Sequence, residues 1–175
     1  MFHLNLVKKA QKGDEKAFLK LIHKEKEKLY RMAFMYMRNE SDALDIVQET
    51  IYKAYISIKN VKEASYFSTW LTRILINTAL DDIKKKNKVI SIEQDSLEKI
   101  ESSQRIDSAD KLDLLQAIDQ LDEKYKTVVV LRYYKDLSVK QIAELLECPE
   151  GTVKTNLHRS INQLKVKLKE ECINE

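Results

Sequence analysis

The chain has 175 residues, of which 43% are hydrophobic and 34% are charged. This length and apolar content can supply the cores of one or two domains, and they exclude a chain that is disordered throughout. Only two glycines and one proline are present, so turns and strands are poorly supplied whereas long helices are well supplied. The composition therefore predicts an all-α protein.

The two cysteines exclude a disulfide scaffold. Cys148 and Cys172 form no CxxC pair, and neither lies at metal-ligand spacing from His3, His23 or His158. No apolar run approaches the roughly 18 residues that a membrane span needs, and the N-terminus lacks the apolar stretch of a secretory signal. We therefore expect a reduced cytoplasmic protein without a metal site, which does not enter a membrane by itself.

Charge is distributed unevenly along the chain, although the formal net charge is only +3. Residues 1–90 carry 18 Lys and Arg against 11 Asp and Glu, residues 91–125 carry 4 against 10, and residues 126–175 carry 9 against 7. A phosphate backbone would attract the basic outer segments and repel the acidic middle. This order suits two DNA-contacting modules around a segment that stays off the duplex. Ordinary solvated surface charge is the alternative interpretation.

The first ninety residues predict three amphipathic helices. Asp14 is a suitable N-cap for a helix that continues to about Arg38, and its apolar stripe consists of Phe18, Leu21, Ile22, Leu29, Met32, Ala33 and Tyr36. After a short polar break at 39–40, Ser41 is expected to cap the second helix. The inward residues of that helix are expected to be Ala43, Ile46, Val47, Ile51, Ala54, Tyr55 and Ile58, and the outward ones Asp45, Gln48, Glu49 and Tyr52.

The third helix follows a polar loop at 59–65. Its residues spaced for burial are Trp70, Leu71, Ile74, Leu75, Ala79 and Ile83, and it is expected to end in the basic run at 84–88. The side chains of Tyr66 and Phe67 suit a core and a nucleic-acid surface equally well, whereas the spacing of Trp70 favours the core. The three helices together predict one compact domain over residues 1–88.

Helical patterning stops after this domain. Residues 89–109 are rich in Ser, Asp, Glu and Gln and almost without aromatics, so we expect a flexible acidic linker. Patterning resumes at 110–121 and at 125–137. The β-branched run at 128–130 fits a strand as well as a helix, but its position between helical segments favours a helix. Residues 110–175 are expected to form a second domain of four helices.

The end of the chain predicts two helices joined by a tight turn. Ser138 and Gln141 can form a capping box, so that a helix begins at Val139. The break falls near 147–148, and Pro149 suits the start of the next helix because it lacks an N–H. The stripes expected to be buried are Val139, Ile142, Ala143 and Leu146 in the first helix and Val153, Leu157, Ile161, Leu164 and Leu168 in the second, which leaves Thr155, His158, Arg159 and Asn162 outside. These outward donors and acceptors favour a DNA-reading helix-turn-helix over an ordinary helical hairpin.

Three segments in this order resemble the extracytoplasmic-function (ECF) sigma factors of the sigma-70 family, which consist of sigma regions two and four. The segments are DALDIVQETIYKAY at 42–55, YFSTWLTRILINTALDDIKKK at 66–86 and LDEKYKTVVVLRYYKDLSVKQIAELLECPEGTVKTNLHRSINQLK at 121–165. One segment alone would be weak evidence, whereas three in order are specific. The resemblance covers nearly the whole chain. It implies a sigma factor that directs core RNA polymerase to promoters and helps to melt them, in a stress response under anti-sigma control.

The resemblance implies roles for three sets of residues. The family's D-x-x-Q-E helix docks on the β′ coiled coil of the polymerase, and its counterparts here are Asp45, Gln48 and Glu49, with Tyr52 on the same face. The next loop and helix open the minus-ten promoter element and hold a flipped base, which implies Lys59, Asn60, Lys62, Ser65, Arg73, Asn77, Lys84 and Lys85. The recognition helix reads the minus-thirty-five element, which implies Thr152, Lys154, Thr155, His158 and Arg159. In one departure, Glu147 stands where the turn often has glycine, so a left-handed conformation there would be strained.

The implied partners are core RNA polymerase, through its β′ coiled coil and β flap, promoter DNA, and a cognate anti-sigma factor that is often anchored in the membrane. A cytoplasmic, nucleoid-associated protein is therefore expected, with a form held at the membrane by the anti-sigma factor, and neither a cofactor nor a small-molecule substrate is expected. The alternative is a helix-turn-helix regulator that senses a ligand and binds a symmetric operator as a homodimer. An enzyme is disfavoured because two glycines form no phosphate-binding loop and three scattered histidines assemble no known catalytic arrangement.

Overall fold

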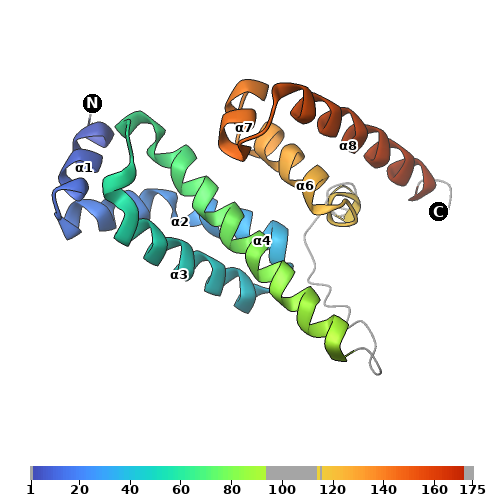
Figure 1. Ribbon diagram of the computed structural model, residues 1–175, viewed down its shortest axis with the longest axis horizontal. Helices are drawn as coiled ribbons and strands as arrows, with labels where there is room; N and C mark the ends of the chain where they lie inside the picture. Colours follow the sequence, from blue (N-terminus) through green and yellow to red (C-terminus); the bar gives the residue numbers. More distant parts are fainter. Residues whose placement is uncertain (1, 94–113, 115, 172–175) are drawn as a thin grey trace. The chain divides into compact units, whose positions relative to one another are not determined.

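Every element in the described part of the chain is helical, which confirms the all-α fold (Figure 1). The computed structural model describes residues 2–93, 114 and 116–171. The chain divides into two units, Met1–Ile100 and Glu101–Glu175, which are described separately here. The division falls within the expected linker, of which residues 94–109 lie outside the described residues. Among the described helices, none has the length and apolar content needed to cross a bilayer.

The first unit is built around helix α2 (Glu15–Met37), which packs against α1 (Phe2–Gln11), α3 (Glu40–Ser57) and α4 (Phe67–Glu93). Asp14 caps α2 as predicted, because its Oδ1 accepts the Ala17 N–H at 3.0 Å. The whole predicted stripe of α2, from Phe18 to Tyr36, is buried. Helix α1 was not expected from the sequence, and it adds Leu6, Val7 and Ala10 to the core.

Two helix ends in this unit differ from the prediction. The N-cap of α3 is Asn39, whose Oδ1 accepts the Asp42 N–H at 3.1 Å, so the expected cap Ser41 is wrong and lies inside the first turn. Helix α4 continues to Glu93, past the expected linker start at residue 89. No glycine or proline interrupts residues 84–93, and an ion pair of 3.0 Å between Asp82 and Lys86 supports the helix there.

Tyr55 of α3 is exposed rather than inward, with 46% of its surface accessible. Its ring packs edge-on against Phe18, with 5.3 Å between centroids, and its hydroxyl donates to Glu15 Oε1 at 3.0 Å. Phe18 already fills the core position, and a hydroxyl at the surface can bond to a polar partner while it remains accessible to water. Ile51, Trp70, Ile74 and Ile83, also expected inside, are half-buried.

The second unit contains helical residues at 114 and 116–119, helix α6 (Glu123–Val129), the π-helical segment η3 (Val130–Tyr134), α7 (Val139–Leu146) and α8 (Glu150–Glu171). The ambiguous run at 128–130 is helical and buried, as predicted. The core includes Leu121, Tyr125 and Val129, on which Ile118 and Leu164 pack. In α7 the buried side chains are Ile142, Ala143 and Leu145, whereas Val139 and Leu146 are half-buried because they lie at the two ends of this short helix.

Candidate nucleic-acid and protein interfaces

One exposed surface lies on α3, and we call it the α3 surface. Asp45, Gln48, Glu49 and Tyr52 are all exposed, and their spacing of three and four residues places them on one helix face. Ile56 extends this face by one turn, and it is as exposed as Tyr52, at 62% against 61%. Sequence reasoning missed Ile56, although its position four residues after Tyr52 was the available signal. Apolar side chains beside carboxylates suit a protein partner better than they suit DNA.

Glu49 of the α3 surface belongs to a small polar network. Its Oε1 lies 3.4 Å from Nζ of Lys53. The same ammonium donates to Oγ1 of Thr78 on α4 at 3.2 Å. Lys53 therefore joins α3 to α4 one residue away from Asn77.

A second surface, the loop–α4 surface, is formed by residues 58–66 and the outer side of α4. The segment expected to be a polar loop contains two 3-10 turns, η1 (Ile58–Asn60) and η2 (Ala64–Tyr66). The side chains of Ile58, Val61 and Phe67 are buried and anchor it. The exposed side chains between these anchors are Lys59, Asn60, Lys62, Glu63, Ser65 and Tyr66. Phe67 thus belongs to the core, and Tyr66 lies at the surface.

Helix α4 adds polar groups to this surface. Arg73 is half-buried, whereas Asn77, Lys84 and Lys85 are exposed. Arg73, Asn77 and Lys84 follow one stripe of the helix, but Lys84 lies two turns beyond Asn77, or about 10 Å along the axis. The structure therefore brings Asn77 and Arg73 together and places the lysines farther along α4.

Lys86, in the basic run, forms ion pairs with two aspartates of the same unit. Its Nζ lies 2.8 Å from Asp42 on α3 and 3.0 Å from Asp82 on α4. Desolvation lowers the pKa of Lys86, but the hydrogen bonds to Asp42 and Asp82 outweigh this effect and raise the pKa above its usual value. The protonated amine at Lys86 thus links α3 to α4, which sets it apart from its neighbours Lys84 and Lys85.

The third surface is the outer side of α8. Ser138 and Gln141 form the predicted capping box, with hydrogen bonds of 2.9 Å and 3.2 Å, and α7 ends at Leu146. Val153 and Leu157 hold α8 on the core. The predicted residues Thr152, Lys154, Thr155, His158 and Arg159 are all exposed, and we call this set the α8 surface.

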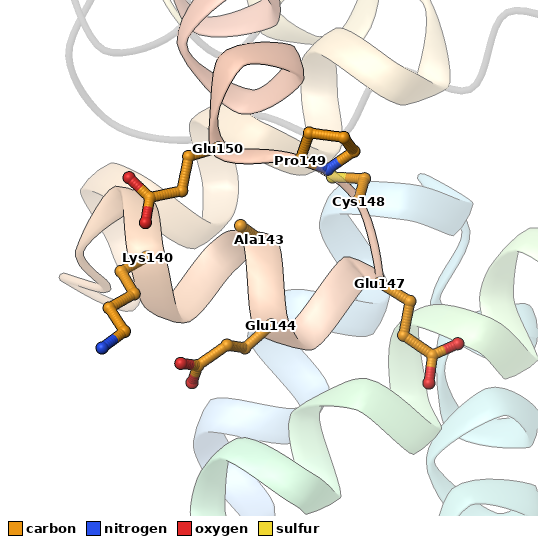
Figure 2. A pocket seen from close by; sticks show the side chains of 7 residues that line it. All are labelled: Lys140, Ala143, Glu144, Glu147, Cys148, Pro149 and Glu150. Atoms are coloured by element: carbon orange, nitrogen blue, oxygen red, sulfur yellow. The ribbon is translucent and has the colours of Figure 1, made fainter.

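The turn between these helices has the strained conformation that the sequence suggested. Glu147 has φ 52° and ψ 44°, in the left-handed region, and its N–H donates to the Ala143 carbonyl. Figure 2 shows a shallow hollow beside this turn, lined by Lys140, Ala143, Glu144, Glu147, Cys148, Pro149 and Glu150. Three carboxylates against one ammonium make this hollow unsuitable for phosphate, in contrast to the α8 surface.

Among the described residues, no three His, Cys, Asp or Glu side chains are grouped as a metal site would require. The three surfaces instead offer amides, hydroxyls, guanidinium and ammonium groups, which suit base edges and phosphates, and exposed apolar side chains, which suit a protein.

Comparison with known proteins agrees with this arrangement. Two families match, described as Sigma-70 region 2 over residues 21–89 and Sigma-70, region 4 over residues 111–164. The sigma factor SigV of Bacillus subtilis is 36% identical over 83% of this chain and 87% of its own length, and the ECF sigma factor SigW of the same organism is 34% identical over 94% and 95%. Such relatives are transcription initiation factors rather than enzymes.

Solved structures share the fold. The sigma factor RpoE of Bartonella quintana, crystallised with the anti-sigma factor NepR, superimposes with a TM-score of 0.77 at 22% identity, over 88% of this chain and 98% of that one. CnrH in complex with the cytosolic domain of CnrY gives 0.71 at 19% identity, over 97% and 99%. Through its two family matches and its relatives, the chain belongs to the extracytoplasmic-function sigma factors of the sigma-70 family.

Proposed function

We propose that the three surfaces divide the work of promoter recognition among them. The α3 surface docks on core RNA polymerase, the loop–α4 surface opens the minus-ten element, and the α8 surface reads the minus-thirty-five element. The observation that carries this proposal is that every residue expected to contact a partner is exposed except Arg73, which is half-buried, and that these residues lie on helices and a loop whose other faces are packed. The chain is then an initiation factor without catalysis of its own.

Docking on the polymerase uses both charge and apolar contact. Asp45 and Glu49 offer carboxylates to basic residues of a β′ coiled coil, and Tyr52 with Ile56 offers apolar area that is now exposed to water. Burying an aromatic and an aliphatic side chain at the centre of a contact is a common source of binding energy, with charged groups at its rim. In the second unit, Tyr133 on η3 is 64% exposed and supports a further contact, with the β flap. π-helical turns occur frequently at functional sites.

Opening of the minus-ten element requires a surface for an unstacked strand. A flipped base needs hydrogen-bonding groups and a stacking surface, and the strand needs cations for its phosphates. Asn77 and Asn60 offer amides, Tyr66 offers an exposed ring, and the lysines at 59, 62, 84 and 85 offer ammonium groups. The loop–α4 surface therefore combines all three requirements within one unit.

The α8 surface recognises duplex DNA in this proposal. In helix-turn-helix proteins the first residues of the second helix contact base edges in the major groove. Thr155 and Arg159 lie one turn apart on the exposed side of α8 and can reach bases, whereas Lys154 suits a phosphate. Promoter elements two helical turns apart are separated by roughly 70 Å. A linker of about 20 residues can span at most about 66–72 Å, so the linker and the two compact units together can cover this distance.

We further propose that an anti-sigma factor controls this chain by covering these surfaces. RpoE, which shares the fold, was crystallised with the anti-sigma factor NepR, and CnrH, which also shares it, was solved in complex with the cytosolic domain of CnrY. The exposed Tyr52 and Ile56 on the α3 surface give an inhibitor the same apolar contact that they give the polymerase. We therefore propose that the protein is cytoplasmic, that an anchored inhibitor holds it at the membrane, and that its release allows it to reach the nucleoid.

Reconstitution with core polymerase tests the proposal. The full chain is mixed with bacterial core polymerase, and transcripts are sequenced from a template library in which both promoter elements are randomised. We expect co-elution with the core enzyme and enrichment of defined bases at two positions separated by two helical turns. Binding of palindromic duplex as a homodimer, without association with polymerase, would instead establish a ligand-sensing regulator.

A further inference from the structure

Helix α1 contacts the loop of the loop–α4 surface directly. This helix lies outside residues 21–89, which match Sigma-70 region 2, yet it packs against both η1 and η2 (Figure 1). Its last residue, Gln11, is half-buried, and its Nε2 donates to the carbonyl oxygen of Val61 at 2.7 Å. This hydrogen bond joins residues 50 positions apart in the sequence.

The acceptor lies at the centre of the loop. Val61 is 4% exposed, and its N–H donates to the Ile58 carbonyl at 3.2 Å. With the bond from Gln11, both the N–H and the carbonyl of Val61 are held, one by the loop itself and one by α1. The next residues on either side, Asn60 and Lys62, are exposed. The orientation of the Val61 carbonyl therefore fixes the direction in which the chain leaves toward Lys62.

We infer that Gln11 is a positioning residue for base recognition by the loop, and this rests on the proposed role of the loop at the minus-ten element. A 3-10 turn has weaker hydrogen-bond geometry than an α-helix and needs support from outside. A site that holds a base selectively must keep its groups within roughly 0.5 Å of the productive geometry. Gln11 supplies that support without touching DNA.

The core of α1 does not depend on Gln11. Leu6, Val7 and Ala10 are the buried residues of this helix. The chain leaves α1 through Gly13, whose N–H donates to the Ala10 carbonyl at 2.9 Å and whose φ is 93°. Replacing Gln11 therefore removes the bond to Val61 and leaves the packing of α1 in place.

Three variants of the full chain test this inference with core polymerase and the doubly randomised template library. Gln11→Met keeps the length and neutrality of the side chain but removes the donor. Gln11→Lys restores a donor of similar reach. Asn5→Met is the control, since Asn5 is an exposed amide on the same helix. Base preference at the minus-ten element is a ratio within one reaction, so neither a reduced folded fraction nor an added charge alters it.

We expect Gln11→Met to lower base discrimination at the minus-ten element by about fivefold, the usual effect of one lost hydrogen bond. Discrimination at the minus-thirty-five element and the affinity for core polymerase should stay unchanged, and Gln11→Lys and Asn5→Met should behave like the wild type. If Gln11→Met keeps the wild-type preference, or if Gln11→Lys loses it equally, Gln11 has no positioning role. A wild-type chain without any minus-ten preference would instead overturn the proposed function of the loop.

Discussion

Replacing Glu147 with glycine should stabilise the second unit. Glu147 adopts φ 52° and ψ 44° at the end of α7. A residue with a Cβ loses about 1–2 kcal/mol in the left-handed region. The greater freedom of glycine in the unfolded chain offsets about 0.5–1 kcal/mol of this gain. The net stabilisation is then about 0.5–1 kcal/mol, which for a small domain corresponds to an increase of roughly 2–8 °C in Tm.

The matched control is Glu147→Ala. The glutamate side chain has interactions of its own, and both substitutions remove them, so the difference between glycine and alanine isolates the backbone conformation. The chain contains one tryptophan, Trp70, which lies in the first unit. Thermal unfolding followed by tryptophan fluorescence therefore reports on the first unit, whereas far-UV circular dichroism reports on both.

We expect Glu147→Gly to raise the melting temperature seen by circular dichroism and to leave the fluorescence transition unchanged. Glu147→Ala should leave the turn strained and give no such increase. Equal melting temperatures for the two variants would show that the left-handed conformation carries no cost here. A shift in the tryptophan signal would show that the two units do not unfold independently.

Five further substitutions test three separate parts of the structure. Thr50→Val should raise the free energy of unfolding of the first unit by about 1 kcal/mol in urea titrations, because Thr50 Oγ1 is buried without a hydrogen-bond partner among the described residues. The control Thr72→Val should lower the free energy of unfolding, because Thr72 Oγ1 donates to the Ser68 carbonyl at 2.8 Å. The hydrogen bond to Glu15, its charge and slight burial raise the pKa of Tyr55, so the neutral form stabilises the fold and this contribution disappears as the pH rises above about 10. Tyr55→Phe should therefore make urea midpoints less sensitive to pH between about 9 and 11. Glu49→Lys should weaken binding to core polymerase in a pulldown and leave binding to duplex DNA unchanged. Arg159→Ala should cost about 1–3 kcal/mol of binding free energy at one minus-thirty-five base and leave polymerase binding unchanged. Loss of the same step in both variants would contradict the division of surfaces.

Local signals in the sequence predicted most helices of this fold. An N-cap side chain and the backbone N–H that donates to it lie within three residues of each other, so the caps at Asp14 and Ser138 could be identified without tertiary information. The stripe of α2 likewise follows from the helical period alone. The same reasoning chose the wrong cap, Ser41, where two good caps stood two residues apart. Asn and Ser are about equally favourable as N-cap residues, and the extended backbone at Asn39 identifies Asn39 as the cap.

Contacts between distant residues could not be predicted in this way. Tyr55 fits the inward stripe of α3 by spacing, but its hydroxyl finds Glu15, which is 40 residues away. Gln11 has no feature in the sequence that points to Val61, and the loop at 58–66 could not be seen as two braced turns. Periodicity shows which face of a helix is buried, and it contains no information about which other element covers that face.

Charge alone would place the nucleic-acid site on a different helix from the one that we propose. The exposed side of α2 carries lysines at 16, 20, 24 and 28 at four-residue spacing, a row that extends over more of its helix than the exposed lysines at 84–86 of α4. Such a row attracts phosphate in a sequence-independent way. Selection of a base needs directional donors, acceptors and a stacking surface as well. Only the loop–α4 surface, among those described, sets amides and an exposed tyrosine, Asn60, Asn77 and Tyr66, beside its lysines. These groups are why we propose base recognition for α4 and its loop, and why we expect the lysines of α2 to add at most a uniform attraction.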